Sequence, residues 1–118
     1  SAWVNSEADI DAVTALSGSG PAYYFLFMEA MQEAAQELGL DEQLVSKFAI
    51  QTALGAAVLA NESDDDVAEL RRKVTSPGGT TERALQNFES GGLRELVKQS
   101  LKAARDRSEE LAAEFGAK

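Results

Sequence analysis

The fold is decided by residues 21–38, which read PAYYFLFMEAMQEAAQEL. Aromatic, aliphatic and methionine side chains fill most of the first half of this stretch, and alanines continue the apolar surface. A helix that is apolar nearly all round is typical of one buried on every side. One small bundle of 118 residues has few places for such a helix. We therefore expect burial against a second copy in an obligate, interlocked dimer, and a monomeric bundle is the alternative.

Turn signals on both sides of this helix separate it from neighbouring helices. Ser17–Gly20 is expected to break the chain before Pro21, because proline cannot donate a backbone hydrogen bond within a helix. At the other end, Gly39 predicts a helix stop. Asp41 then predicts the N-cap of a second long helix that ends near Asn61. This second helix is rich in small residues near its end, which allows close approach of another helix.

Shorter helical segments complete the pattern. Ser6 is expected to cap a first helix, and Ser63 a short helix whose first turn holds Asp64–Asp66. Two more helices are expected beyond residue 81, separated by the pair of glycines at 91–92. No segment shows the alternation of a strand. The sequence therefore predicts an all-α fold, with residues 1–118 as one domain.

Composition excludes several classes of function. The chain contains no His and no Cys, which removes histidine-based catalytic triads, thiol nucleophiles and cysteine-rich zinc sites, and no metal site is expected. Its net charge of −9 argues against nucleic-acid binding. Ala49–Ala60 is expected to be too short and too interrupted to span a membrane. Residues 1–4 lack the features of a signal peptide, so we expect a cytoplasmic protein.

Charge is distributed unevenly along the chain. Residues 1–66 hold 12 acidic groups and one basic group, whereas residues 67–118 hold 8 acidic and 10 basic groups. Solvated helix faces explain this pattern adequately. The alternatives are that the second half handles something anionic, or that the halves face each other across an interface.

The loop from Ser76 to Thr81 has the composition of an anion site. Gly78 and Gly79 leave backbone N–H groups accessible, and the following helix N-terminus adds partial positive charge. Hydroxyl groups of Ser76, Thr80 and Thr81 could donate to a carboxylate or phosphate. Three basic residues, 71–73, lie just upstream. A helix-capping turn, with Thr80 or Thr81 as the cap, is the alternative. The other glycine cluster, Ser17–Gly20, does not follow a strand and lacks dinucleotide-loop spacing.

Several stretches, in order and at matching spacings, resemble the C-terminal domain of pyrroline-5-carboxylate reductase. They are Asp11–Tyr23 (DAVTALSGSGPAY), Gln51–Ala57, Val74–Thr81 (VTSPGGTT), Glu89–Arg94 and Arg107–Leu111. The resemblance covers essentially the whole chain. It implies an interlocked helical dimerisation domain, like the C-terminal domain of 6-phosphogluconate dehydrogenase. It also implies that the family's N-terminal Rossmann domain is absent from this chain, which would then be a fragment without activity of its own.

The resemblance implies an enzyme of proline biosynthesis that reduces 1-pyrroline-5-carboxylate to L-proline with NADPH or NADH. The NADP or NAD would be bound by the absent domain, so no cofactor-binding residue is expected here. The resemblance further implies a homodimer, which in this family often assembles into a pentamer of dimers. A stand-alone helical scaffold without chemistry is the alternative function.

The family's substrate loop carries over onto the matching positions of this sequence. Backbone groups around Gly78, Gly79, Thr80 and Thr81, with the Ser76 hydroxyl, would hold the substrate carboxylate. The residues expected to line the ring are Val74 and Thr75. The Thr81 hydroxyl would lie near the imine nitrogen and is the expected catalytic group. The family often has His-Pro where this chain has Asp66-Val67, and the role of the neighbouring aspartates stays open.

Overall fold

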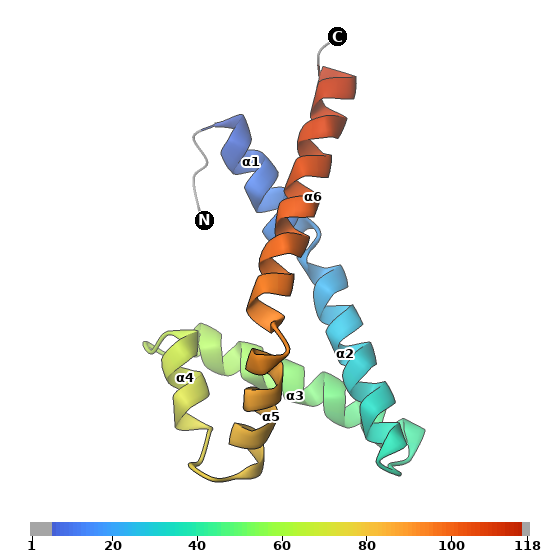
Figure 1. The fold of residues 1–118 in the computed structure, drawn as a ribbon, viewed down its shortest axis with the longest axis vertical. Helices are drawn as coiled ribbons and strands as arrows, with labels where there is room; N and C mark the ends of the chain where they lie inside the picture. The colour runs from blue at the N-terminus through green and yellow to red at the C-terminus, as the bar shows by residue number, and fades with distance from the viewer. Residues whose placement is uncertain (1–5, 117–118) are drawn as a thin grey trace. The chain divides into compact units, whose positions relative to one another are not determined.

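The computed structural model describes residues 6–116, and every regular element in that range is helical (Figure 1). The expectation about a signal peptide falls on residues 1–4, outside the described residues. The elements are α1 (Glu7–Val13), a π-helix η1 (Thr14–Gly18), α2 (Gly20–Glu37), α3 (Glu42–Glu62), α4 (Val67–Lys73), α5 (Thr80–Ser90) and α6 (Leu93–Gly116). The prediction of an all-α fold is confirmed.

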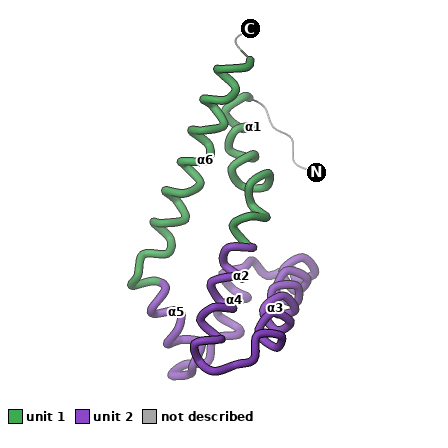
Figure 2. The backbone as a smooth tube through the Cα atoms, turned by 90° about the vertical axis from the view of Figure 1, so that its right-hand side faces the viewer, with its two compact units in different colours: residues 1–24, 89–118 green, residues 25–88 purple. Residues whose placement is uncertain are grey.

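The chain divides into two compact units, which are coloured separately in Figure 2. Unit 1 combines the two ends of the chain, residues 1–24 and 89–118, and unit 2 is the continuous stretch 25–88. In unit 1, α6 contacts both α1 and η1. Unit 2 contains most of α2 and all of α3 and α4, and it carries the glycine loop that the sequence singles out.

The first helical segment of unit 1 is held at both ends by side-chain hydrogen bonds. The Ser6 hydroxyl accepts from the backbone N–H of Asp9 at 3.2 Å, which confirms the predicted N-cap. Beyond α1 the chain widens into the π-helix, and a new helix starts at Gly20, immediately before Pro21. The Tyr23 hydroxyl donates to the Ala15 carbonyl at 2.7 Å and so ties the restarted helix to η1.

The turn between α2 and α3 follows its sequence signals closely. Gly39 adopts a φ of +98°, and the N–H of Leu40 donates to the Ala35 carbonyl, which is the hydrogen-bond pattern of a Schellman stop. Asp41 caps α3 by accepting from the Gln43 N–H at 2.8 Å. Both predictions are confirmed.

The start of α4 differs from expectation. The helix begins at Val67 and its N-cap is Asp66, whose carboxylate accepts from the Glu69 N–H at 2.9 Å. Ser63 instead ends α3, and its hydroxyl accepts from the Asp65 N–H at 3.0 Å. The prediction of a Ser63 cap was wrong because an aspartate closer to the helix competes for the same role.

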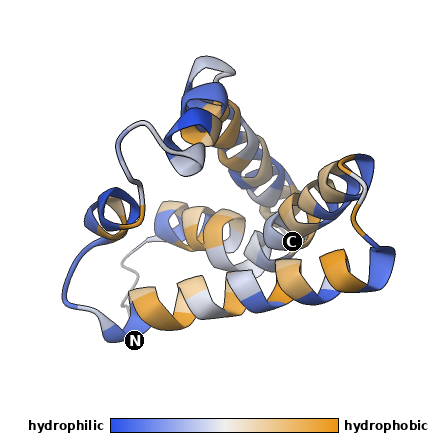
Figure 3. Cartoon of the chain, turned by 90° about the horizontal axis from the view of Figure 1, so that it is seen from below, coloured by the Kyte–Doolittle hydropathy of each residue, from blue (hydrophilic) through white to orange (hydrophobic). Residues whose placement is uncertain are grey.

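The α2 helix is not buried on all sides within one chain. Tyr24, Phe25 and Leu26 are 69%, 67% and 66% exposed. Among the described apolar residues, Ala15 and Val45 are buried, and hydrophobic stretches lie along several helices in Figure 3. The apolar surface of α2, which the sequence predicted to be buried, is therefore exposed in a single chain.

The α3 helix, Glu42–Glu62, has nearly the bounds that the sequence predicted. At 21 residues it is long and apolar enough, by length and composition, to cross a membrane, which corrects the expectation drawn from Ala49–Ala60. The core helix of a water-soluble protein meets the same criterion. The small residues of α3, such as Gly55, have open space around them: a Cβ added there would meet no atom within 4 Å.

Candidate functional site

The predicted site residues lie together in the segment that joins α4 to α5, within unit 2. Val74 follows the last residue of α4, and Thr80 and Thr81 are the first two residues of α5. Val74 is 63% exposed, so its side chain is available to a ligand. The site is therefore a short loop that runs directly into a helix N-terminus.

A tight turn at residues 76–79 gives the loop its shape. The Gly79 N–H donates to the Ser76 carbonyl at 3.1 Å, across Pro77 and Gly78. Gly78 has a φ of +74°, which is the geometry of a type II turn with proline at its second position. A Cβ added to Gly79 would lie 3.3 Å from the Ser76 carbonyl oxygen. Gly78 is therefore favoured by its backbone angle, and Gly79 by the close approach of the Ser76 carbonyl.

Two of the loop's backbone donors are already engaged within the loop. Besides the Gly79 bond, the Gly78 N–H donates to Oε1 of Glu82 at 3.0 Å. Thr80 and Thr81 open α5, where backbone N–H groups have no intrahelical acceptor. The backbone can therefore offer an anion these two N–H groups and that of Glu82, together with the partial positive charge of the helix end.

The hydroxyl groups of the loop fall into two kinds. Thr75 donates its hydroxyl to the Arg71 carbonyl at 2.5 Å, so this group is occupied in closing α4. Within the described residues, no such bond engages the hydroxyls of Ser76, Thr80 and Thr81, and all three residues are exposed. The alternative that Thr80 or Thr81 is a helix cap is therefore not what this structure shows, since both lie inside α5.

The basic residues before the loop are mostly neutralised by their own neighbours. Arg72 pairs with Glu69 at 2.8 Å, and Lys73 pairs with Asp65. The hydrogen bond from Lys73 to Asp65, followed by their charge attraction, raises the pKa of Lys73 above its ordinary value. Within the described residues Arg71 makes no ion pair. It is the member of the trio whose charge remains available to an anion.

The neighbouring aspartates have structural roles in this chain. Asp65 takes part in the Lys73 ion pair, and Asp66 caps α4. In the described part of the chain, no group of acidic residues is arranged to hold a metal ion. The Ser17–Gly20 stretch lies where η1 passes into α2, with a helix rather than a strand before it. Its geometry does not fit a dinucleotide loop.

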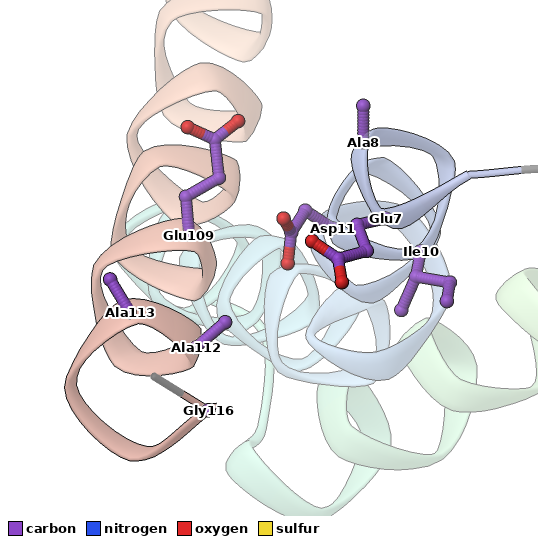
Figure 4. Close-up of a pocket in the computed structure, with 8 residues that line it drawn as sticks. All are labelled: Glu7, Ala8, Ile10, Asp11, Glu109, Ala112, Ala113 and Gly116. Carbon is purple, nitrogen blue, oxygen red and sulfur yellow. The ribbon is translucent and has the colours of Figure 1, made fainter. Parts of the chain in front are cut away.

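A groove of about 620 Å³ lies in unit 1, between α1 and α6, and contains none of the predicted site residues (Figure 4). Its charged lining is acidic, from Glu7, Asp11 and Glu109, and the rest of its lining is apolar and mostly small, including Ala112 and Ala113. These groups offer no positive charge to an anionic ligand. We therefore place the candidate site at the glycine loop, where donors converge.

One residue that contacts the loop, Glu82, was not predicted from the sequence. Glu82 contacts the loop backbone, and the signal that could have identified it is its position as the third residue of a helix, from which glutamate reaches back to preceding N–H groups. Thr75 was expected to line the substrate ring, and in the structure its hydroxyl donates to the Arg71 carbonyl.

Comparison with known proteins gives a consistent picture. The model of the pyrroline-5-carboxylate reductase dimerisation family matches residues 7–111. A pyrroline-5-carboxylate reductase of Pseudomonas aeruginosa is 55% identical over 97% of this chain, and one of Pasteurella multocida is 46% identical over 96%. In each case the chain covers 42% of the relative. It thus spans about two fifths of the length of these curated relatives.

Solved structures share the fold. A pyrroline-5-carboxylate reductase from Coxiella burnetii superimposes with a TM-score of 0.89 at 55% identity, covering 92% of this chain and 40% of that one. A Plasmodium falciparum pyrroline carboxylate reductase with NADP bound gives 0.84 at 35% identity, covering 88% and 40%. The helical arrangement described above is therefore one that longer, solved chains also contain.

Proposed function

This chain belongs to the pyrroline-5-carboxylate reductase dimerisation family, and we propose that it forms the dimerisation and substrate-binding part of an NAD(P)H-dependent pyrroline-5-carboxylate reductase. The enzyme would reduce 1-pyrroline-5-carboxylate to L-proline, in proline biosynthesis. The observation that carries this proposal is the family match over residues 7–111, supported by named reductases up to 55% identical. Because that match spans both compact units, residues 1–118 are proposed to act as one domain.

The loop would hold the substrate through its carboxylate. The proposed donors are the N–H groups of Thr80 and Thr81 and the Ser76 hydroxyl, and the α5 N-terminus favours negative charge beside them. Gly78 and Gly79 keep side chains away from that approach. Val74, with its exposed side chain, and Thr75 would contact the pyrroline ring.

The Thr81 hydroxyl is the proposed catalytic group. Placed near the imine nitrogen, it would orient the ring and hold or relay the proton that makes the imine carbon a better hydride acceptor. When bound, NADPH or NADH supplies the hydride to that carbon. The described residues of this chain offer no dinucleotide loop, so the cofactor is proposed to be held by residues outside the 118.

The proposed assembly is a homodimer with interlocked helices. The chain exposes 9537 Å² of surface, whereas even two separate globular units of half its mass would together expose about 7,500 Å². An excess of about 2,000 Å² per chain is in the range that obligate dimers bury. We propose that a second copy covers the apolar faces of α2 and α3. Association of dimers into a pentamer of dimers is a further proposal.

In such a dimer the apolar surface of α3 would be buried against protein, so α3 would not need a membrane to cover it. With its apolar surface buried against a partner and a net charge of −9, the enzyme would be soluble and cytoplasmic, with no membrane or nucleic acid among its partners. The small-molecule partner would be pyrroline-5-carboxylate itself.

The proposed function is tested by following NADPH and NADH oxidation with pyrroline-5-carboxylate. The complete gene product and the 118-residue chain are assayed side by side. Turnover by the complete product, and none by this chain, is the expected result. If the complete product is folded and dimeric yet inactive with both cofactors, the fold has been kept without the chemistry, and the scaffold alternative replaces the proposal.

A further inference from the structure

Glu82 contacts the loop that is proposed to bind the substrate carboxylate. Its Oε1 accepts a hydrogen bond from the Gly78 N–H at 3.0 Å. Gly78 is the residue with a φ of +74°, at the corner of the turn. Glu82 is half-buried, in the first turn of α5. A side chain from the helix therefore reaches back and holds the most constrained residue of the loop.

This bond determines which donors remain for a ligand. Because Gly78 donates to Glu82 and Gly79 donates to Ser76, neither N–H competes for an incoming anion. The N–H groups of the first turn of α5, which are those of Thr80, Thr81 and Glu82, are left for the oxygens of a carboxylate. A bond to an ionised acceptor is stronger than one between neutral groups, so it can fix the turn.

We propose that Glu82 is a positioning residue of the carboxylate-binding loop, acting through its hydrogen bond to Gly78. This inference rests on the proposed function. In this role Glu82 would touch neither the substrate nor the reacting atoms. It holds the turn so that the Thr80 and Thr81 donors are already oriented when the substrate arrives, which reduces the ordering that binding requires.

The test compares three variants of the complete reductase in steady-state kinetics with pyrroline-5-carboxylate. Glu82→Ala removes the acceptor, whereas Glu82→Gln keeps an acceptor oxygen at the same position and removes the charge. Glu95→Ala is the matched control: Glu95 is also the third residue of its helix, but it accepts from Gln99 within α6 rather than from a loop. Thermal midpoints and solution masses are measured alongside.

The expected results separate positioning from simple helix capping. Glu82→Ala should raise KM for pyrroline-5-carboxylate about tenfold, the effect of losing one charge-assisted hydrogen bond, with kcat within about twofold of the parent. Glu82→Gln should restore KM to within about threefold, and Glu95→Ala should leave it unchanged. A capping role alone would lower the thermal midpoint of Glu82→Ala and leave its KM at the parent value.

Three outcomes would overturn the inference. An unchanged KM in Glu82→Ala shows that the loop does not need this bond, and an equal rise of KM in Glu82→Gln shows that charge rather than the hydrogen bond matters. In both cases the parent enzyme still turns over, so the proposed function stands. If the parent enzyme itself does not reduce pyrroline-5-carboxylate, the proposed function fails and the inference fails with it.

Discussion

The Ser108 hydroxyl donates a hydrogen bond to Oδ1 of Asp11 at 2.7 Å, joining α6 to α1 across 97 positions of sequence. Asp11 is 9% exposed and is the buried charged residue of the described chain. A carboxylate removed from water needs such a donor, because without one its desolvation is uncompensated. This bond is therefore a specific connection between the two ends of the chain in unit 1.

Replacing Ser108 with alanine should destabilise the protein by about 1.5–3 kcal/mol, since a buried carboxylate oxygen loses its donor. Ser100→Ala on the same helix is the matched control. The Ser100 hydroxyl donates to the Leu96 carbonyl of its own helix at an exposed position. Its loss should change stability by less than about 0.5 kcal/mol. Denaturant unfolding at fixed protein concentration measures both, and equal effects would show that the Asp11 bond contributes nothing specific.

The dimer interface should include the outer face of α3. Ile50, Leu54 and Val58 follow one another at intervals of four on this helix and are 50%, 63% and 44% exposed. Leu54→Glu should convert a dimer at low micromolar concentration into monomer or unfolded chain, because a charge would be buried without a partner. Gln43→Glu, which adds the same charge at the start of α3, should leave the dimer intact.

Light scattering coupled to gel filtration distinguishes these outcomes. A parent chain that is folded and monomeric at low micromolar concentration would contradict the interlocked-dimer proposal. A Leu54→Glu variant that remains dimeric would move the interface to another face of the molecule.

Thr81 is expected to matter for turnover rather than for folding. In the complete reductase, Thr81→Ala should lower kcat about 100-fold, the usual scale for losing a group that positions or relays a proton. Thr81→Ser keeps the hydroxyl and should stay within about tenfold of the parent. Both variants should remain dimeric by mass, since Thr81 is exposed at the first turn of α5. Unchanged kinetics in Thr81→Ala would remove the catalytic role.

The ionised Asp106 carboxylate should contribute a small part of the free energy of unfolding, and this part should be lost at acidic pH. The hydrogen bonds from Lys102, at 2.7 Å, and from Arg105, at 2.9 Å, hold the pKa of Asp106 below its ordinary value. A carboxyl whose pKa is lower when folded stabilises the protein above its unfolded pKa, which is about 4. That contribution is lost as the pH falls from about 5 through the folded pKa.

The variant Asp106→Asn isolates this contribution. Thermal midpoints of parent and variant should converge as the pH falls from 7 to 3, because the parent loses an interaction that the variant already lacks. The difference at neutral pH should be small, since these ion pairs are exposed to solvent. Parallel midpoint curves over this range would show that the Asp106 pairs do not contribute to stability.

Local chemistry determined how much of the fold could be read from sequence. Ser6, Gly39 and Asp41 each act on backbone groups within five residues, so their helix ends were predicted correctly. The start of α4 was not, because Ser63 and Asp66 are both good caps and sequence does not rank them. The sequence likewise did not predict the widened π-helical turn η1.

Contacts between residues far apart in the sequence could not be predicted from local patterns. Nothing in the sequence pairs Asp11 with Ser108, because each is an ordinary polar residue in an amphipathic helix. The loop was identified from its glycines, yet Glu82 was missed because its contact depends on the turn angle at Gly78. The exposed surface of α2 belongs to the face that the proposed dimer would cover, and the packing of one chain does not include that contact.

Because unit 1 is built from both ends of the chain, its assembly during synthesis must wait for the last helix. Unit 2 is continuous and can begin to form while translation is still under way. By contrast, α1 emerges early but meets its partner α6 only after residue 93 has left the ribosome. Until then the surfaces of α1 and η1 that α6 contacts, which include Asp11, stay exposed to water. Contacts between residues this far apart in sequence form more slowly than local ones, so unit 1 is expected to fold later than unit 2.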